Sequence, residues 1–257
     1  MRIAAFQFAV SGDITQNLDT VLSALHRAKE HGVQLAVFPE CALTGYPPRN
    51  IAKAADVDFS QVSDACNVLR EAADSLDIAF IIGTVYRENG KIFNRALFFR
   101  PNEEIESYDK RALWGWDRDN FAPGSGNGVF TLGDVRIGVR ICFEVRFPEY
   151  FRELYAEKTD LNVILFYDCA DTDDAKRYDM IKGHVQTRAV ENVCTTLCVN
   201  TVSPFQTAPT AVFGRSGQVL CECERNKDGF ILFDFEKQPL DFGEQGRKEL
   251  SDALIEG

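Results

Sequence analysis

Histidine is scarce in this sequence, and the paired cysteines typical of zinc sites are missing. Only three histidines occur among the 257 residues, and no two cysteines have Cys-x-x-Cys spacing. A structural zinc site needs a full set of Cys or His ligands, commonly in closely spaced pairs. We therefore expect no metal centre.

Basic clusters and long apolar runs are also absent. The chain carries 39 acidic and 28 basic residues, for a formal net charge of −11. Binding to nucleic-acid phosphates needs clustered Lys and Arg, so we expect no nucleic-acid partner. No apolar run approaches the ~20 residues that cross a bilayer. The N-terminus opens on a strand-like pattern without the features of a signal peptide, which predicts a cytoplasmic protein with no membrane partner.

Eight cysteines are present, an even number that would also fit disulfides. The chain is long for a disulfide-stapled domain, and most of its cysteines stand in apolar, strand-like runs. Reduced, buried thiols fit this placement better. We expect all eight to be free: Cys41, Cys66, Cys142, Cys169, Cys194, Cys198, Cys221 and Cys223.

Strand-like and helix-like segments alternate along the chain. Apolar patterns predict strands at 2–10, 33–38, 78–85, 92–99, 104–108, 128–132, 135–142, 161–167, 194–200, 210–214, 217–223 and 229–235. Helical spacing predicts helices near 14–32, 60–76, 148–157 and 173–191, the first capped by Asp13. Residues 111–128 have no period, which indicates a long ordered loop. We expect one α/β domain over 1–257, with mixed sheets, outer helices and a tail from about 238 that packs on a partner or frays.

Three reactive side chains each follow an apolar strand. Glu40 comes after LAVFP, Lys110 after IESYD and Cys142 after RIGVRI. Loops beyond the carboxyl ends of strands form the active-site rim of α/β proteins, so the three groups can share one pocket.

These residue types suit acyl transfer. A carboxylate can take the proton of a thiol and return it to a leaving amine. A nearby lysine lowers the pKa of a thiol and stabilises an oxyanion, with the backbone N–H of Phe143 as a second donor. Chemistry alone leaves purely structural roles open for these residues, because buried core thiols and surface carboxylates are common.

Four segments in order carry a family resemblance: FPECALTGYPP, YDKRAL, RICFEVRFPE and RAVENVCTTLCVN. They resemble the Glu, Lys and Cys signatures and a further stretch of the nitrilase superfamily, the carbon–nitrogen hydrolases, from the first strand to about residue 235. The resemblance implies a four-layer αββα sandwich, a Glu40-Lys110-Cys142 triad, a thioester acyl-enzyme and no cofactor. It also implies a homodimer or higher oligomer, with the segments after Cys142 and His184 as interface candidates.

The sequence departs from this family pattern near Lys110. Members often have a histidine two residues after the lysine, where this chain has Ala112. Many also have a second Glu six residues before a Pro-Gly pair, where this chain has Asp117. Asp117 or Asp119 is therefore the expected second acid, unless both only form loop turns.

The residues beside the cysteine favour amide over nitrile hydrolysis. Nitrilases commonly have Trp directly after it, whereas this chain has Phe143, and CFEVRFPE looks closest to the branch of ω-amidases and deaminated-glutathione amidases. Arg146 can bind a substrate carboxylate through two hydrogen bonds. The alternative is that Arg146 forms a salt bridge with Glu144 or Glu149.

Tyr46, Tyr167 and Asp168 are further expected substrate contacts. Asp168 is the first residue of an acidic run that also contains Asp171, Asp173 and Asp174. This run favours a cationic substrate. Alternatively, the last three aspartates form the solvated start of a helix. A small amide is the expected substrate. The alternatives are a carbamoyl-amine or carbamoyl-amino-acid hydrolase, a nitrilase, a glutaminase subunit and an inactive dimeric scaffold.

Overall fold

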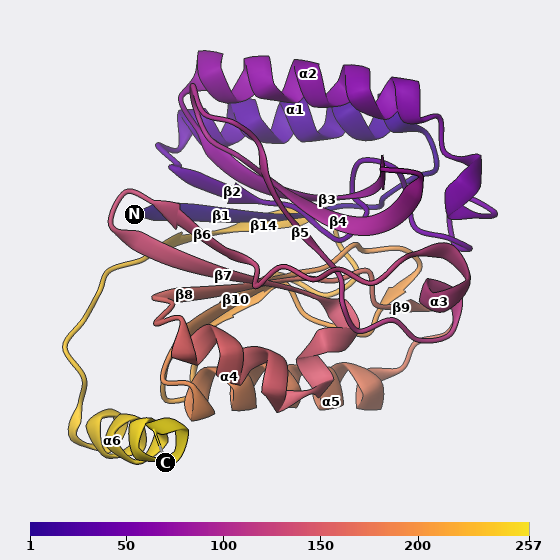
Figure 1. The fold of residues 1–257 in the computed structure, drawn as a ribbon. Helices are drawn as coiled ribbons and strands as arrows, with labels where there is room; N and C mark the ends of the chain where they lie inside the picture. Colours follow the sequence, from indigo (N-terminus) through magenta and orange to yellow (C-terminus); the bar gives the residue numbers. More distant parts are fainter. Residues whose placement is uncertain (257) are drawn as a thin grey trace.

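Two mixed β-sheets lie face to face at the centre of the molecule, and helices cover both outer faces (Figure 1). This arrangement is seen in a computed structural model of the chain, which describes residues 1–256. The expected four-layer αββα sandwich is confirmed.

The first sheet joins the N-terminal part of the chain to one late strand, in the order β14-β1-β2-β3-β4-β5. β1, β2 and β3 are parallel, and β4 and β5 each turn back antiparallel. β5 therefore runs in the same direction as β2, so their carboxyl ends share one edge. The strands are β1 (Arg2–Gln7), β2 (Leu35–Val37), β3 (Ala79–Glu88), β4 (Lys91–Phe99), β5 (Glu106–Asp109) and β14 (Gly229–Asp234).

The second sheet has the order β13-β12-β10-β8-β7-β6. Its central strands β7, β8 and β10 are parallel, and the outer strands are antiparallel to their neighbours. The loops after β7 and β8 therefore leave from the same edge. The strands are β6 (Val129–Leu132), β7 (Val135–Ile141), β8 (Leu161–Leu165), β10 (Thr195–Val199), β12 (Ala211–Phe213) and β13 (Val219–Glu222).

Four helices form the outer layers. α1 (Ile14–Glu30) and α2 (Phe59–Leu76) cover the first sheet, and α4 (Pro148–Ala156) and α5 (Ala175–Glu191) cover the second (Figure 1). Asp13 caps α1 as expected, because its side chain accepts the first free N–H groups of the helix. Within residues 1–256, none of the helices combines the length and apolarity needed to cross a membrane.

The strands alternate between two kinds of core. In β1, Ile3 and Ala5 join the central cluster between the sheets, whereas Ala4 and Phe6 join the cluster under α1 and α2. This follows from the two-residue period of a strand. Strands buried on both faces are apolar throughout, and they hold the loops at their carboxyl ends on a rigid base.

Several short elements differ from expectation. Residues 111–128, expected as a loop, contain the helix α3 (Trp116–Asn120). β9 (Cys169–Ala170) and β11 (Phe205–Gln206) form a small ribbon of their own. Two 3₁₀ turns, η1 (Ala54–Asp56) and η2 (Cys142–Arg146), complete the set. Elements this short are invisible to periodicity, which needs a window of about 11 residues or more.

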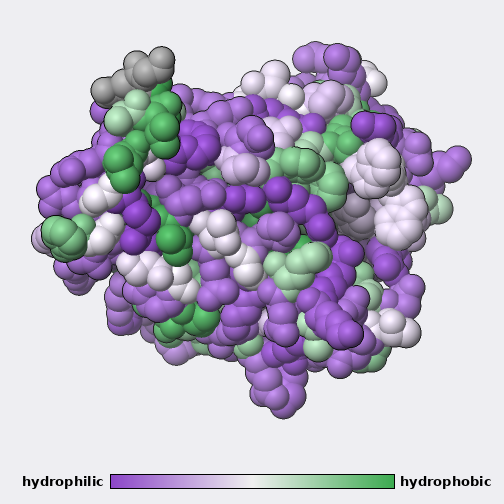
Figure 2. All heavy atoms as spheres, turned by 90° about the horizontal axis from the view of Figure 1, so that it is seen from below, coloured by the Kyte–Doolittle hydropathy of each residue, from purple (hydrophilic) through white to green (hydrophobic). Residues whose placement is uncertain are grey.

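The C-terminal tail forms the helix α6 (Phe242–Glu256) and packs on the body of its own chain. The Tyr155 hydroxyl of α4 contacts the Lys248 carbonyl at 3.1 Å and the Asp252 carboxylate at 2.5 Å. At these contacts the tail packs on its own chain, whereas a partner contact or a frayed end was expected. The far side of α6 leaves Leu250 and Leu254 exposed, and Figure 2 shows apolar surface on this helix from below.

Candidate active site

Lys110 lies between two carboxylates where the two sheets meet. Its Nζ is 2.7 Å from Glu40 Oε1 and 2.8 Å from Asp117 Oδ2. The side chains of Lys110 and Glu40 are 1% and 0% exposed. Of the two acids considered, Asp117 contacts the lysine, whereas Asp119 lies exposed on the other side of α3.

Glu40 is held by two donors that sequence reasoning missed. Asn94 Nδ2 donates to Oε1 at 2.7 Å, and the backbone N–H of Tyr167 donates to Oε2 at 2.8 Å. A buried Asn within the apolar strand β4 was the one available signal for the first contact. The second contact comes from the loop after β8, so Glu40 bridges the two sheets.

The turn that carries Glu40 passes directly over β3. Cys41 has a φ of 51°, a left-handed conformation that costs a residue with a side chain roughly 1–2 kcal/mol. A Cβ on Gly83 would lie 2.4 Å from the Cys41 backbone nitrogen and 2.6 Å from Glu40 Cα. The turn can approach β3 this closely because position 83 has no side chain.

Cys142 stands at a sharp turn between β7 and η2. Its φ is 45°, and it lines the same pocket as Lys110 and Asp117. Phe143 follows as the second residue of η2. The first N–H groups of a helix have no partner inside the helix, which suits the expected oxyanion donor. That role stays a prediction.

The pocket has a volume of about 500 Å³ and is lined by all four expected substrate contacts, Tyr46, Arg146, Tyr167 and Asp168. The rings of Tyr46 and Tyr167 stack with their centres 5.0 Å apart. The Tyr46 hydroxyl donates to Asp117 Oδ1 at 2.8 Å, so this tyrosine also holds the Asp117 carboxylate in place. Sequence reasoning missed Trp114 and Trp116. Both tryptophans line the pocket, and each is more than half exposed.

Arg146 and Asp168 differ in their availability to a ligand. Asp168 Oδ1 already accepts hydrogen bonds from Arg177 at 2.8 Å and Thr207 at 2.6 Å. No carboxylate of residues 1–255 lies within 4.0 Å of the Arg146 guanidinium, which lies over the Phe143 ring, 5.5 Å from its centre. The alternative salt bridge of Arg146 with Glu144 or Glu149 is therefore absent from the described chain.

The sequence matches a known hydrolase family. The family model for carbon–nitrogen hydrolase matches residues 2–238. The chain belongs to the carbon–nitrogen hydrolase family. Similar curated proteins include an (R)-stereoselective amidase from Pseudomonas sp, 29% identical over 60% of this chain and 56% of the relative. The omega-amidase NIT2 of Xenopus tropicalis is 26% identical over 61% of this chain and 59% of the relative. The chain thus spans little more than half the length of these relatives.

Solved structures of this family extend the similarity over the whole fold. An amidase from Nesterenkonia sp. has a TM-score of 0.81 and 29% identity, covering 99% of this chain and 96% of that chain. Other structures of the Nesterenkonia sp. AN1 amidase show acrylamide, or an acetamide group from fluoroacetamide, added to the active-site cysteine.

In this member of the family, burial raises the pKa of the Cys142 thiol well above its ordinary value, and the Glu40 carboxylate raises it further. Lys110 acts in the opposite direction without reversing the shift. Lys110 thus lowers the pKa of the thiol as expected, but burial and Glu40 outweigh its effect. The charge of the lysine is offset by Glu40 and Asp117, so the sulfur keeps its proton at neutral pH and needs a base to remove it.

The lysine and the glutamate have pKa values suited to opposite roles. Burial lowers the pKa of Lys110, but contact with Glu40 and Asp117 outweighs burial and the net direction is upward. Lys110 is therefore a stable cation. Burial raises the pKa of Glu40, Asp117 adds to that shift, and Lys110 opposes it. A carboxylate with a raised pKa accepts a proton more readily.

Proposed function

We propose that this chain hydrolyses the carbon–nitrogen bond of a small amide, releasing ammonia and a carboxylate through a thioester on Cys142. One observation carries the proposal: the buried Glu40–Lys110–Asp117 contact lies at the pocket that Cys142 lines. Similarity to amidases, some with adducts on their active-site cysteine, supports it.

In the first half-reaction the Cys142 sulfur attacks the amide carbon while Glu40 takes the thiol proton. The tetrahedral intermediate then collapses and the carbon–nitrogen bond breaks. Glu40 returns its proton to the departing nitrogen, which leaves as ammonia. The acyl group remains on sulfur as a thioester.

In the second half-reaction water attacks the thioester carbon. Glu40 takes a proton from the water and gives it to the departing Cys142 sulfur when the carbon–sulfur bond breaks. The acid product then loses its own proton to solvent. One residue thus serves as base and acid in both halves, and the free enzyme is restored.

Lys110 and the Phe143 N–H are the proposed donors to the oxyanion of each intermediate. Donors that are fixed before the reaction stabilise developing charge without reorganising. Asp117 is the proposed second acid, which holds Lys110 in place while Tyr46 holds Asp117.

Arg146 favours an amide that also carries a carboxylate. Its guanidinium lines the pocket and has no carboxylate partner within residues 1–255. Tyr46 and Tyr167 supply an aromatic wall for the carbon chain between the two ends. The carbamoyl-amine alternative depends on the charge of Asp168, which Arg177 offsets.

We further propose a homodimer and a cytoplasmic location, with residues 1–257 as one domain. The exposed apolar side chains of α6 support association of two copies (Figure 2). All eight cysteines are free, which confirms the expected pairing state and fits a reducing compartment. Light scattering after size-exclusion chromatography tests the oligomeric state.

An ammonia-release screen over small amides, ureas and nitriles tests the activity. We expect release from amides without carbon dioxide, and an acyl adduct on Cys142 by intact mass and peptide mapping. C142A should abolish turnover and the adduct, while C66A, a cysteine-to-alanine change in α2, should retain both. Turnover by purified C142A near the wild-type rate would show that another residue is the nucleophile.

A further inference from the structure

A second fully buried carboxylate, Glu144, lies two residues after Cys142 and has no step in the proposed reaction. Glu144 is part of the η2 turn and is 0% exposed. Burying a carboxylate is costly unless hydrogen-bond donors surround it. The position of those donors therefore shows what the charge stabilises.

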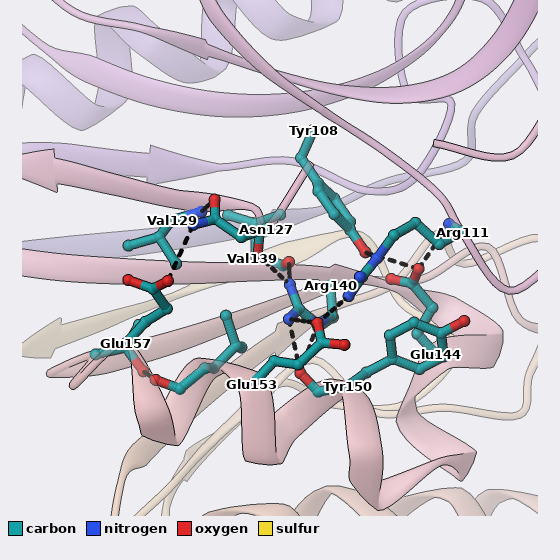
Figure 3. Close-up of polar contacts among 12 residues, drawn as sticks. Tyr108, Arg111, Asn127, Val129, Val139, Arg140, Glu144, Tyr150, Glu153 and Glu157 are labelled. Carbon is teal, nitrogen blue, oxygen red and sulfur yellow. Dashed lines mark hydrogen bonds and ion pairs between the residues drawn. The ribbon is translucent and has the colours of Figure 1, made fainter. Parts of the chain in front are cut away.

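Four donors converge on the Glu144 carboxylate, two of which, Tyr108 and Arg111, are labelled in Figure 3. Oε1 accepts from the Tyr108 hydroxyl at 2.7 Å, the Arg111 N–H at 2.8 Å and the Ala112 N–H at 3.4 Å. Oε2 accepts from the Ile141 N–H at 2.7 Å. A carboxylate has about four acceptor sites, and the number of donors equals this, with three of them on Oε1.

Three of these donors are backbone groups next to the reactive residues. Arg111 and Ala112 directly follow Lys110, which leaves the first sheet after β5. Ile141 directly precedes Cys142, which leaves the second sheet after β7. One carboxylate therefore ties the segment that carries the lysine to the segment that carries the cysteine. We propose that Glu144 is a positioning residue that fixes Lys110 Nζ relative to Cys142 Sγ.

The cations around Glu144 have other partners. The buried Arg140 guanidinium donates to the carbonyls of Asn127 and Val139, both at 2.8 Å, and of Tyr150 at 2.6 Å (Figure 3). The Arg111 guanidinium pairs with Glu153 on α4. Glu153 thus belongs to the same polar cluster but has no contact with the backbone beside Lys110 or Cys142, which makes it a matched control.

A glutamine at 144 has nearly the same shape but only one acceptor oxygen. Its NH₂ group must then face an N–H donor of one of the two segments. One segment moves away, and a misplacement of about 1 Å can cost about 100-fold in rate. The pocket wall and Arg146 are unaffected, so substrate binding should persist.

The kinetic test rests on the proposed amidase activity. For E144Q we expect kcat to fall by at least about tenfold while KM stays within about twofold, because the change acts on the reacting groups. E153Q should keep both constants within about twofold. Y108F removes one donor but keeps all three backbone contacts, so its kcat should lie between those of E153Q and E144Q.

A second readout needs no turnover. The rate of Cys142 alkylation by iodoacetamide, followed by peptide mapping across pH, depends on how closely Lys110 and Glu40 approach the sulfur. We expect E144Q to shift this pH profile and E153Q to retain it. An E144Q profile identical to that of the wild type overturns the positioning role, even if turnover falls.

The two readouts separate the two proposals. If the wild type releases ammonia from no compound in the screen, the proposed function fails, and the alkylation profile still decides the role of Glu144. If thermal melts show that E144Q does not fold, Y108F decides it: a shifted profile with cooperative melting supports positioning, and a wild-type profile overturns it.

Discussion

Asp117 contacts Lys110 from a short helix that lies in a loop between the two sheets' strands. The 2.8 Å contact between Asp117 Oδ2 and Lys110 Nζ is made from the five-residue α3, within the segment between β5 and β6. Tyr46 holds the other oxygen of the carboxylate. The second acid therefore depends on a loop, whereas Glu40 and Lys110 lie directly beyond strands.

Replacing Asp117 should lower the activity, whereas replacing the nearby Asp119 should not. We expect D117N to lower kcat by at least about tenfold, because Lys110 loses one of the two carboxylates that hold it in place as an oxyanion donor. D119N should stay within about twofold, since Asp119 is exposed. Steady-state kinetics with one amide measures both. Equal activity of the two variants would contradict the role given to Asp117.

Arg146 should affect amides that carry a carboxylate and leave neutral amides alone. For R146A we expect KM for the half-amide of a small dicarboxylic acid to rise by at least about tenfold, the loss of a charge-assisted pair. The KM for a neutral amide of similar length should change little. R146K should restore the first value only in part, because lysine cannot bind a carboxylate through a planar fork. A parallel rise for both amides would point to a general disturbance of the pocket.

Gly83 should control the position of Glu40, because the turn that carries Glu40 lies where a side chain at position 83 would be. In G83A the new Cβ would lie 2.4 Å from the Cys41 nitrogen, and such overpacking costs about 1–3 kcal/mol. We expect a lower melting temperature and a large loss of kcat. G126A is the control, because a Cβ there meets nothing within 4 Å. Full activity in G83A would mean that the Glu40 turn can shift freely.

Stability should fall in alkaline solution because burial raises the pKa of the thiols, that of Cys66 to about 11. An unfolded thiol has a pKa of about 8.5, so above that pH the unfolded chain loses protons that the folded chain keeps. The free energy of unfolding then falls by up to about 1.4 kcal/mol per pH unit for each such thiol. Below about pH 8 this contribution is constant.

Urea unfolding from about pH 7 to 10 measures this slope. C66A removes one of the thiols, so its unfolding free energy should decline less steeply by one thiol's share. Equal slopes for the wild type and C66A would indicate that Cys66 titrates alike in both states.

The sequence predicted the parts of the site that lie directly beyond regular strands. Glu40, Lys110 and Cys142 each follow an apolar run and stand in a family-like segment, and the structure brings Glu40 and Lys110 into contact. The alternating strands and the Asp13 cap were equally visible, because both depend on local spacing.

The parts that escaped prediction depend on tertiary contacts. Asn94 and the Tyr167 N–H reach Glu40 from segments 54 and 127 residues away, and no local pattern marks such pairs. The sequence indicated that burial would raise the pKa of Cys142 and that Lys110 would lower it, but not which effect is larger. That balance depends on the two carboxylates that contact the lysine and on how deeply all these groups are buried.

The contact between Glu40 and the Tyr167 N–H joins the two halves of the sandwich. Glu40 and Lys110 come from one sheet, whereas Cys142 and this N–H come from the other. A folding intermediate in which only one sheet has formed would carry an ordinary cysteine without its base. Cys142 therefore gains its proposed base only when the two sheets dock. An amide that acylates Cys142 only with the help of Glu40 would label completed molecules, whereas a chain that has formed one sheet would keep an ordinary thiol that reacts with general alkylating reagents.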